Sequence, residues 1–285
     1  NKITNSYGGA VRLRSSGTTL FEDNEISGNK DAYLYIEDQK GDVTVKDNTW
    51  SNNTSFWFNI SSSYQENLNI LVEGNSIIEG SGNQISGITV ENHRASTEIL
   101  IQNNTVETRY DGIRTSSSYN STPKILGNTI KGTNHQSGNG ISVSNKAKAT
   151  IENNTIENKQ NGIYVQYSDA NGDGSGVIKG NVIKGNSGYG VRVEQYAKPV
   201  ISLNDIENNN GYFVDNQTTY TVDARNNWWG ETLKAVIESG DNPRALDKFY
   251  DQYDDSTKGL VNYAGWLDAT ATDPNNPPTL IAQMS

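Results

Sequence analysis

Asparagine recurs along this chain at nearly even intervals, and each copy usually stands two places before an isoleucine, valine or tryptophan. The intervals are 23 to 29 residues long. A repeat of this length is typical of solenoids, propellers and arrays, in which each repeat forms one supersecondary unit. The repeated residues are Asn1, Asn24, Asn48, Asn75, Asn104, Asn128, Asn154, Asn181, Asn204 and Asn227.

Each repeat reads as a turn, a strand, a loop and a second strand. A glycine-led run with alternating apolar and polar residues follows the asparagine turn, as at residues 87–90, 140–143 and 190–193. Alternation with period two indicates a strand with one buried face. Residues 1–227 have no sustained apolar period of 3.6 residues, so the sequence predicts an all-β fold.

Strands this short bury a face only if equivalent strands of successive repeats stack on one another. The sequence therefore predicts a parallel β-helix of about ten coils, roughly 45–50 Å long at about 4.8 Å per coil. A propeller is the competing architecture, but its blades need about 40–50 residues each. The asparagines are expected to turn the corners and to form a ladder of side-chain amides.

The C-terminal part of the chain departs from the repeat after residues 226–230. Residues 231–239 fit a short amphipathic helix with Leu233, Val236 and Ile237 on one side. We therefore predict a β-helix over 1–230, a cap over 231–267, and a linker over 268–285 toward a following domain. Because Asn1 already lies inside a repeat, we expect the chain to be part of a longer protein.

The composition restricts the partners. The chain has 23 basic and 33 acidic residues, which argues against nucleic acid and against anionic membranes. No run of 18 apolar residues is present, so no membrane-inserted helix is expected. The chain has no cysteine and one methionine, which excludes disulfides and thiolate metal sites. These features favour a secreted or cell-surface protein of a bacterium or archaeon.

The Asn-x-Ile turns and glycine-led strands resemble the right-handed parallel β-helix repeats of the pectate-lyase-like superfamily, and more narrowly those of the CASH and NosD types. The Asn-Asn-Trp-Trp-Gly run at 226–230 is similar to the closing motif of secreted members. The resemblance covers about residues 1–267 and implies a right-handed β-helix. Coils of this kind carry lyases, hydrolases, epimerases and non-catalytic surface proteins, so the fold leaves the activity open.

Alternation within the glycine-led strands places two rows of side chains on the outer face. Trp57 lies just before the first outward row. The first outward row is Arg12, Tyr35, Asn59, Thr89, Arg114, Ser142, Tyr164, Arg192 and Phe213. The second outward row is Arg14, Glu37, Ser61, Glu91, Ser116, Ser144, Gln166, Glu194 and Asp215.

Aromatic and charged side chains are interleaved in these rows, which suits a carbohydrate ligand. Aromatic faces stack on sugar rings, and carboxylates accept hydrogen bonds from sugar hydroxyls. The candidate substrate-binding residues are Tyr35, Glu37, Trp57, Glu91 and Phe213. An ordinary solvated strand face is the alternative interpretation.

A catalytic site on the same face is a second hypothesis. The candidate catalytic residues are Asp111, Arg114, Tyr164, Arg192 and Glu194. The resemblance implies lyases with an Arg, Lys or Tyr base and with Ca²⁺ or Arg neutralising a uronate carboxylate. Hydrolases instead need two carboxyl groups about 5–10 Å apart. The sequence carries no signature that distinguishes these activities.

One segment matches the first half of a calcium-binding loop. Asp169, Asn171 and Asp173 have the required spacing, and a glycine follows. The twelfth position is Gly180, where such a loop has a bidentate acid. Calcium is the one cofactor that the sequence suggests, and an ordinary turn is the alternative.

Together, these features predict a secreted or cell-surface β-helix module that binds a polysaccharide or cell-surface glycan without cleaving it. Further domains of the same polypeptide are expected partners. A polysaccharide lyase or glycoside hydrolase acting along the outer strand face is one alternative. A structural stalk or adhesin spacer, in which the rod only sets distance, is the other.

Overall fold

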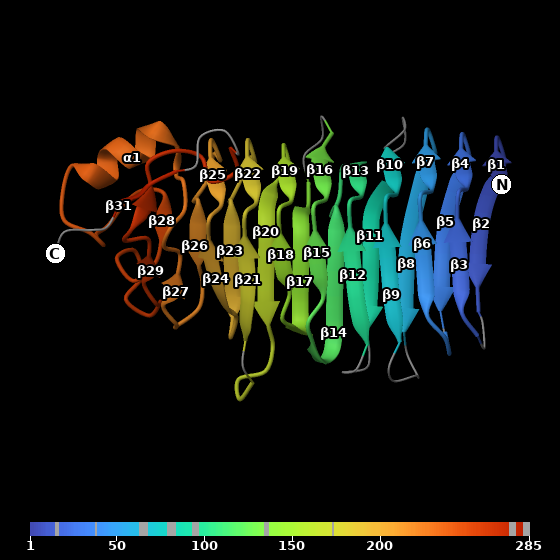
Figure 1. Cartoon of the computed structure of the whole chain (residues 1–285), viewed down its shortest axis with the longest axis horizontal. Coiled ribbons are helices and arrows are strands. Elements are labelled where there is room, and N and C mark those ends of the chain that lie inside the picture. Colours follow the sequence, from blue (N-terminus) through green and yellow to red (C-terminus); the bar gives the residue numbers. More distant parts are fainter. Residues whose placement is uncertain are drawn as a thin grey trace.

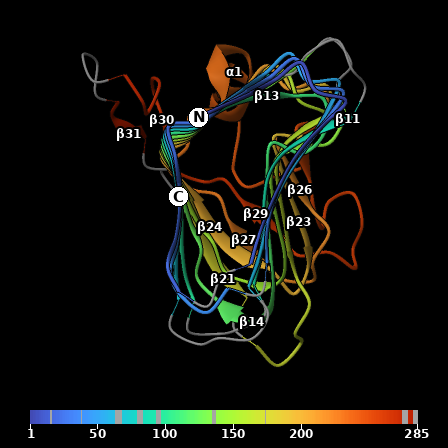
Figure 2. The ribbon, with the colours of Figure 1, turned by 90° about the vertical axis from the view of Figure 1, so that its right-hand side faces the viewer.

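The computed structural model describes residues 1–14, 17–37, 39–62, 68–78, 84–92, 97–133, 137–172, 174–273 and 278–281. The chain forms a rod whose strands run across its long axis (Figure 1). Seen end-on, the strands of successive coils superimpose around one interior (Figure 2). Neighbouring strands within each long sheet are parallel, so the predicted parallel β-helix is confirmed.

Three sheets form the sides of the rod, with nine, ten and ten strands in the described part of the chain. Sheet A contains β1 (Lys2–Thr4), β4 (Glu25–Ser27), β7 (Thr49–Ser51), β10 (Ser76–Ile78), β13 (Thr105–Thr108), β16 (Thr129–Gly132), β19 (Thr155–Glu157), β22 (Val182–Lys184) and β25 (Asp205–Glu207). Sheet B contains β2 (Gly8–Leu13), β5 (Asp31–Glu37), β8 (Ser55–Ser62), β11 (Gln84–Asn92), β14 (Ile113–Ser121), β17 (Asn139–Ala147), β20 (Asn161–Tyr167), β23 (Val191–Gln195), β26 (Val214–Asn216) and β28 (Phe249–Tyr250). Sheet C contains β3 (Thr19–Glu22), β6 (Val43–Lys46), β9 (Asn69–Glu73), β12 (Glu98–Gln102), β15 (Lys124–Leu126), β18 (Thr150–Glu152), β21 (Ser175–Lys179), β24 (Lys198–Ser202), β27 (Val222–Asp223) and β29 (Val261–Asn262).

The repeated asparagines form a continuous ladder at the corner between sheets C and A. Asn128 is representative: its amide nitrogen donates to the side-chain oxygen of Asn154 over 2.9 Å and to the Ile101 carbonyl over 3.0 Å. The same Asn154 oxygen accepts from the backbone N–H of Asn128. Equivalent amide-to-amide bonds link the repeated asparagines from Asn1 to Asn227. The predicted ladder is therefore confirmed, and it satisfies polar groups buried at the corner.

A second column of corner side chains contains a buried lysine. Asn186 donates to Asn209 in this column over 2.8 Å, and the Lys159 backbone N–H donates to Asn186 over 2.9 Å. The Lys159 side chain is fully buried, and its ammonium donates to the carbonyls of Thr108 and Tyr110. An ammonium group thus satisfies corner carbonyls that lie two coils away from its own strand.

The glycines that lead the sheet B strands make room for isoleucines of sheet A. A Cβ atom on Gly140 would lie 2.2 Å from Ile156 Cγ2 and 2.7 Å from the Gly162 carbonyl oxygen. The strand register aligns Ile141, which follows Gly140, with Phe58 in β8 and Leu34 in β5. The residues that precede these two, and so correspond to Gly140, are Trp57 and Tyr33. The glycine is therefore a feature of the later coils, and β5 and β8 carry aromatic residues at the equivalent place.

The cap closes the C-terminal end of the rod with α1 (Gly230–Glu238) and with β28 and β29, which extend sheets B and C. Leu233 and Ile237 are buried as predicted, whereas Val236 is 44% exposed. Val236 differs from the prediction because it lines an open cavity between α1 and the last coil instead of packing in the core. The ring of Trp229 packs edge-on against Phe249, with 5.0 Å between ring centroids.

Part of the segment after the cap lies against the rod. β30 (Trp266–Leu267) pairs antiparallel with β31 (Leu280–Ile281). The buried Asp205 carboxylate accepts from the Ala271 N–H over 2.5 Å and from the Thr272 hydroxyl. The boundaries expected at 230 and 267, and the linker expected over 268–285, stay predictions.

Candidate functional site

The two outward rows lie on the outer face of sheet B. In the first row, Arg114 pairs in register with Thr89 and Ser142, and Tyr164 pairs with Ser142 and Arg192. In the second row, Glu91 pairs with Ser61 and Ser116. The predicted order of the first row is confirmed from Arg12 to Arg192, and that of the second row from Glu37 to Ser144. The strand register therefore carries side chains far apart in sequence onto one surface.

The last coil corrects the prediction for Phe213. Val214 pairs with Val191, so Asp215 rather than Phe213 stands beside Arg192 in the first outward row. Phe213 is only 5% exposed, and its ring stacks on Trp229 with 6.5 Å between centroids. It occupies the place that Gly190 holds in the preceding coil. Phe213 is therefore not an outer-face substrate-binding residue, and Asp215 belongs to the first row rather than the second.

Tyr164, Arg192, Glu194 and Asp215 form a contiguous group that we call the Arg192 cluster. The Tyr164 hydroxyl donates to Glu194 Oε2 over 2.8 Å. Arg192 Nε donates to Glu194 Oε1 over 2.6 Å, and Arg192 Nη1 lies 3.0 Å from Asp215 Oδ2. Three predicted catalytic residues are thus in contact, and the guanidinium of Arg192 joins two carboxylates.

The surroundings of the Arg192 cluster keep Tyr164 and Arg192 protonated, so both side chains act as hydrogen-bond donors rather than as bases. Burial and the hydrogen bond to Glu194 raise the pKa of Tyr164 well above its usual value. Burial acts against the charge of Arg192, but Glu194 and Asp215 outweigh it and raise the pKa of this guanidinium. Burial also raises the pKa of the Asp215 carboxyl, against the opposing effects of Gln217 and Arg192. Tyr164 and Arg192 are consequently held in their protonated forms.

A stack of tyrosines borders the Arg192 cluster. The rings of Tyr189 and Tyr212 are stacked with 6.0 Å between centroids, and the Tyr250 ring lies 5.4 Å from that of Tyr212. The guanidinium carbon of Arg192 lies 5.2 Å from the centroid of Tyr189. Sequence reasoning missed this stack because Tyr250 comes from the cap and has no place in the repeat.

Asp111 and Arg114 lie apart from the Arg192 cluster. They line a shallow cavity of about 240 Å³ with Thr89, Tyr110 and Gly138. Asp111 Oδ1 accepts from the Asn139 backbone N–H over 2.7 Å and from its side-chain amide over 3.2 Å. Two register steps separate Arg114 from Tyr164, which corresponds to roughly 10 Å. The five predicted catalytic residues therefore fall into two groups.

Tyr33, Tyr35 and Trp57 form an aromatic patch near the N-terminal end of the same face. Trp57 is 52% exposed and pairs in register with Tyr33, and Tyr35 is 37% exposed. Tyr33 was not predicted, although its alternation with Tyr35 along β5 is the signal that identifies it. The patch is rigidly mounted, because Leu34 and Phe58 on the opposite side of these strands are buried in the core.

Charged residues adjoin the aromatic patch. Glu37 accepts hydrogen bonds from the Nε atoms of Arg12 and Arg14, the latter over 3.0 Å. These bonds and the two positive charges lower the pKa of Glu37 to about 2. Glu91 lies two register steps from Glu37, with Ser61 between them, so these two carboxylates are not neighbours.

The segment with calcium-loop spacing is stabilised by a lysine. Lys146 Nζ lies 3.0 Å from Asp169 Oδ2, and the Asn171 N–H donates to Asp169 Oδ1 over 3.1 Å. Both interactions, the lysine first, lower the pKa of Asp169. Asp173 lies outside the described residues. Those that are described contain no cluster of three or more His, Cys, Asp or Glu arranged to hold a metal ion. Calcium binding therefore stays a prediction.

The comparisons with known proteins agree with the fold. A family model described as the right handed beta helix region matches residues 1–138 and 120–245, so the chain belongs to the right-handed β-helix family. Searches of curated proteins and of solved structures gave no match. Over the described ranges, no helix is long and apolar enough to cross a membrane.

Proposed function

We propose that the outer face of sheet B binds a polysaccharide or cell-surface glycan, and that this chain is a non-catalytic module of a larger secreted or cell-surface protein. The observation that carries the proposal is the aromatic patch, where Trp57 is half exposed beside Tyr33 and Tyr35 on a rigid strand surface. Large exposed aromatic side chains lose little conformational entropy on binding and stack well on the apolar faces of sugars.

The charges on this face support a neutral glycan over a polyanionic one. Arg12 and Arg14 are both bonded to Glu37, and Arg192 is bonded to Glu194 and lies against Asp215. Glu194 and Asp215 together outweigh the charge of Arg192, so the Arg192 cluster offers little attraction to uronate or sulfate groups, whereas Glu37 offsets one of the two positive charges of Arg12 and Arg14. The net charge of −10 adds a general repulsion of polyanions. Glu37 and Glu194 remain suitable acceptors for sugar hydroxyls.

Affinity electrophoresis in gels that contain neutral, uronate or sulfated polysaccharides tests the proposal. We expect a neutral polysaccharide to retard the protein and Trp57→Ala to abolish the retardation. Leu20→Ala is the matched control, because Leu20 is 63% exposed on sheet C and lies away from this face. Equal migration of the protein in every gel would contradict the proposal and favour the structural stalk.

Glycoside hydrolysis is a second candidate function, and one observation favours it. Glu194 and Asp215 contact the same guanidinium, while burial raises the pKa of Asp215. Two carboxyl groups in different environments are the arrangement that general acid catalysis uses. New reducing ends from a bound polysaccharide, lost in Glu194→Gln, would establish hydrolysis. Unsaturated products absorbing in the ultraviolet would instead establish lyase activity.

A further inference from the structure

A cavity of about 500 Å³ lies between α1 and the last coil of the rod, away from the outer face of sheet B. Apolar side chains from three segments form its walls. Phe213 precedes β26, Leu233 and Val236 come from α1, and Leu246 comes from the loop that follows the helix. This volume is within the range of sites that bind small molecules.

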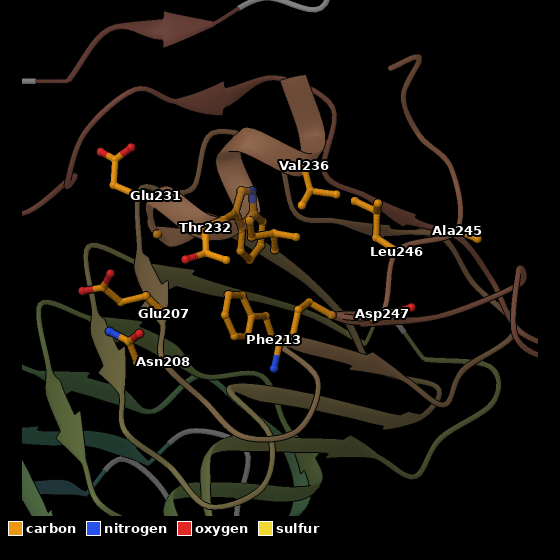
Figure 3. Close-up of a pocket in the computed structure, with 13 residues that line it drawn as sticks. Glu207, Asn208, Phe213, Glu231, Thr232, Val236, Ala245, Leu246 and Asp247 are labelled. Carbon is orange, nitrogen blue, oxygen red and sulfur yellow. The ribbon is translucent and has the colours of Figure 1, made fainter. Parts of the chain in front are cut away.

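The charges around the cavity are predominantly negative. Glu207 and Glu231 lie on one side and Asp247 on the other, with Phe213 and Val236 between them (Figure 3). Glu231 has only a long ion pair with Lys234, at 3.9 Å. Within the described chain, Glu207 and Asp247 have no ion-pair partner. Acidic residues therefore flank the apolar space on two sides, and the carboxylates of Glu207 and Glu231 extend away from Phe213 (Figure 3).

The lysine at the cavity does not neutralise these carboxylates. The Lys248 ammonium donates to the carbonyls of Asn209 over 3.1 Å and of Gly211 over 3.2 Å, and it lies 5.1 Å from the Phe213 ring centroid. It thus belongs to the corner of the last coil in the same way that Lys159 belongs to an earlier corner. The N-terminus of α1 carries a partial positive charge, and no side chain caps it. This partial charge offsets part of the negative charge of Glu207.

We propose that this cavity binds a linear diamine or polyamine, with its hydrocarbon chain against the apolar walls and an ammonium group toward each acidic end. Alkyl chains gain from contact with Phe213, Val236 and Leu246, and ammonium groups pair with Glu207 and Asp247. Anions are disfavoured by the same carboxylates, and neutral chains lack the ion pairs.

Isothermal titration calorimetry with three chains of equal length tests the charge requirement. Cadaverine has two ammonium groups, pentylamine has one, and pentanediol has none. We expect cadaverine to bind most tightly, with up to about fivefold loss of affinity for each ammonium removed. Added salt should weaken cadaverine binding, because the ion pairs are partly exposed. Pentanediol binding as well as cadaverine, or no heat with either cadaverine or spermidine, would overturn the proposal.

Substitutions of residues that line the cavity test whether cadaverine binds there. Glu207→Gln with Asp247→Asn should weaken cadaverine, and Val236→Lys should block it by placing an ammonium at the cavity. Glu238→Gln is the control, because Glu238 is exposed on α1 and does not line the cavity. These positions are at least partly exposed, and unchanged thermal midpoints verify folding.

Two further results separate this site from others. Trp57→Ala should leave cadaverine binding unchanged, so failure of glycan binding does not affect this test. An equal loss of cadaverine affinity in Glu238→Gln would contradict the assignment to this cavity. Binding of a lysine-flanked apolar peptide by a protein that ignores cadaverine would show that the cavity serves protein recognition instead.

Discussion

The side-chain amide of Asn128 donates to the side-chain oxygen of Asn154, 26 residues further along the chain, over 2.9 Å. The Asn128 oxygen in turn accepts from both the backbone N–H and the amide of Asn104. All three side chains are buried. One residue thus satisfies polar groups of the coil before and the coil after it.

Replacing Asn128 by alanine should destabilise the rod by about 3 kcal/mol, because several buried donors and acceptors lose their partners. The shift in the urea midpoint measures this loss. Asn69→Ala is the control, because the Asn69 side chain is exposed at the start of β9 and should tolerate the change. A variant of Asn128 as stable as that control would show that the ladder contributes little to stability.

Gly140→Ala should cost about 1–3 kcal/mol, because the added methyl group would overlap Ile156 Cγ2 and the Gly162 carbonyl. Gly8→Ala is a matched control, since no heavy atom lies within 4 Å of a Cβ at that position. A double-mutant cycle with Ile156→Ala isolates the contact, and the two substitutions together should cost less than the sum of their separate costs. Additive effects of the two substitutions would argue against the predicted overlap.

The carboxyl of Glu37 should titrate with a pKa of about 2 in carbon-detected NMR. Arg12→Gln with Arg14→Gln should return this pKa to the ordinary glutamate value of about 4.3. Because the folded-state pKa is lowered, the stabilisation is present above about pH 4.3 and is lost as the pH falls toward 2. A midpoint near 4.3 in the unsubstituted protein would show that the arginines do not hold this carboxylate.

Calcium binding at residues 169–173 would have to displace Lys146 from Asp169, since the ammonium lies 3.0 Å from the carboxylate oxygen. Lys146→Met should therefore raise the affinity of this loop for calcium, measured by calorimetry. Asp169→Asn in the same background should remove the gain. If neither the unsubstituted protein nor Lys146→Met responds to calcium, the segment is an ordinary turn.

The repeat in the sequence was sufficient to predict the stacked coils. Asparagine at each corner and glycine ahead of the inward residues are both enforced by packing, as Asn128 and Gly140 illustrate. The failure at Phe213 has a physical reason as well. A large ring replaces glycine at this place and stacks on Trp229, and the next strand of sheet B, β28, comes from the cap and does not follow the repeat.

The candidate site was less predictable than the fold. Periodicity assigns a side chain to a face, so Arg114 and Tyr164 were correctly placed on one surface. It does not bring them into contact, because each coil adds a full strand spacing between equivalent positions. The tyrosine stack depends on Tyr250, whose strand joins sheet B only through tertiary packing of the cap.

The strictly parallel register has a consequence for the distance between Trp57 and Arg192. Five strand-to-strand steps separate β8 from β23 in sheet B, which sets their separation along the rod at roughly 24 Å. Deleting or duplicating one whole repeat between them would change this separation by one strand spacing and would leave the surroundings of Trp57 and of Arg192 unchanged. Gain or loss of whole repeats therefore adjusts the distance between Trp57 and Arg192 to ligands of different lengths, while the residues around each of the two groups stay the same.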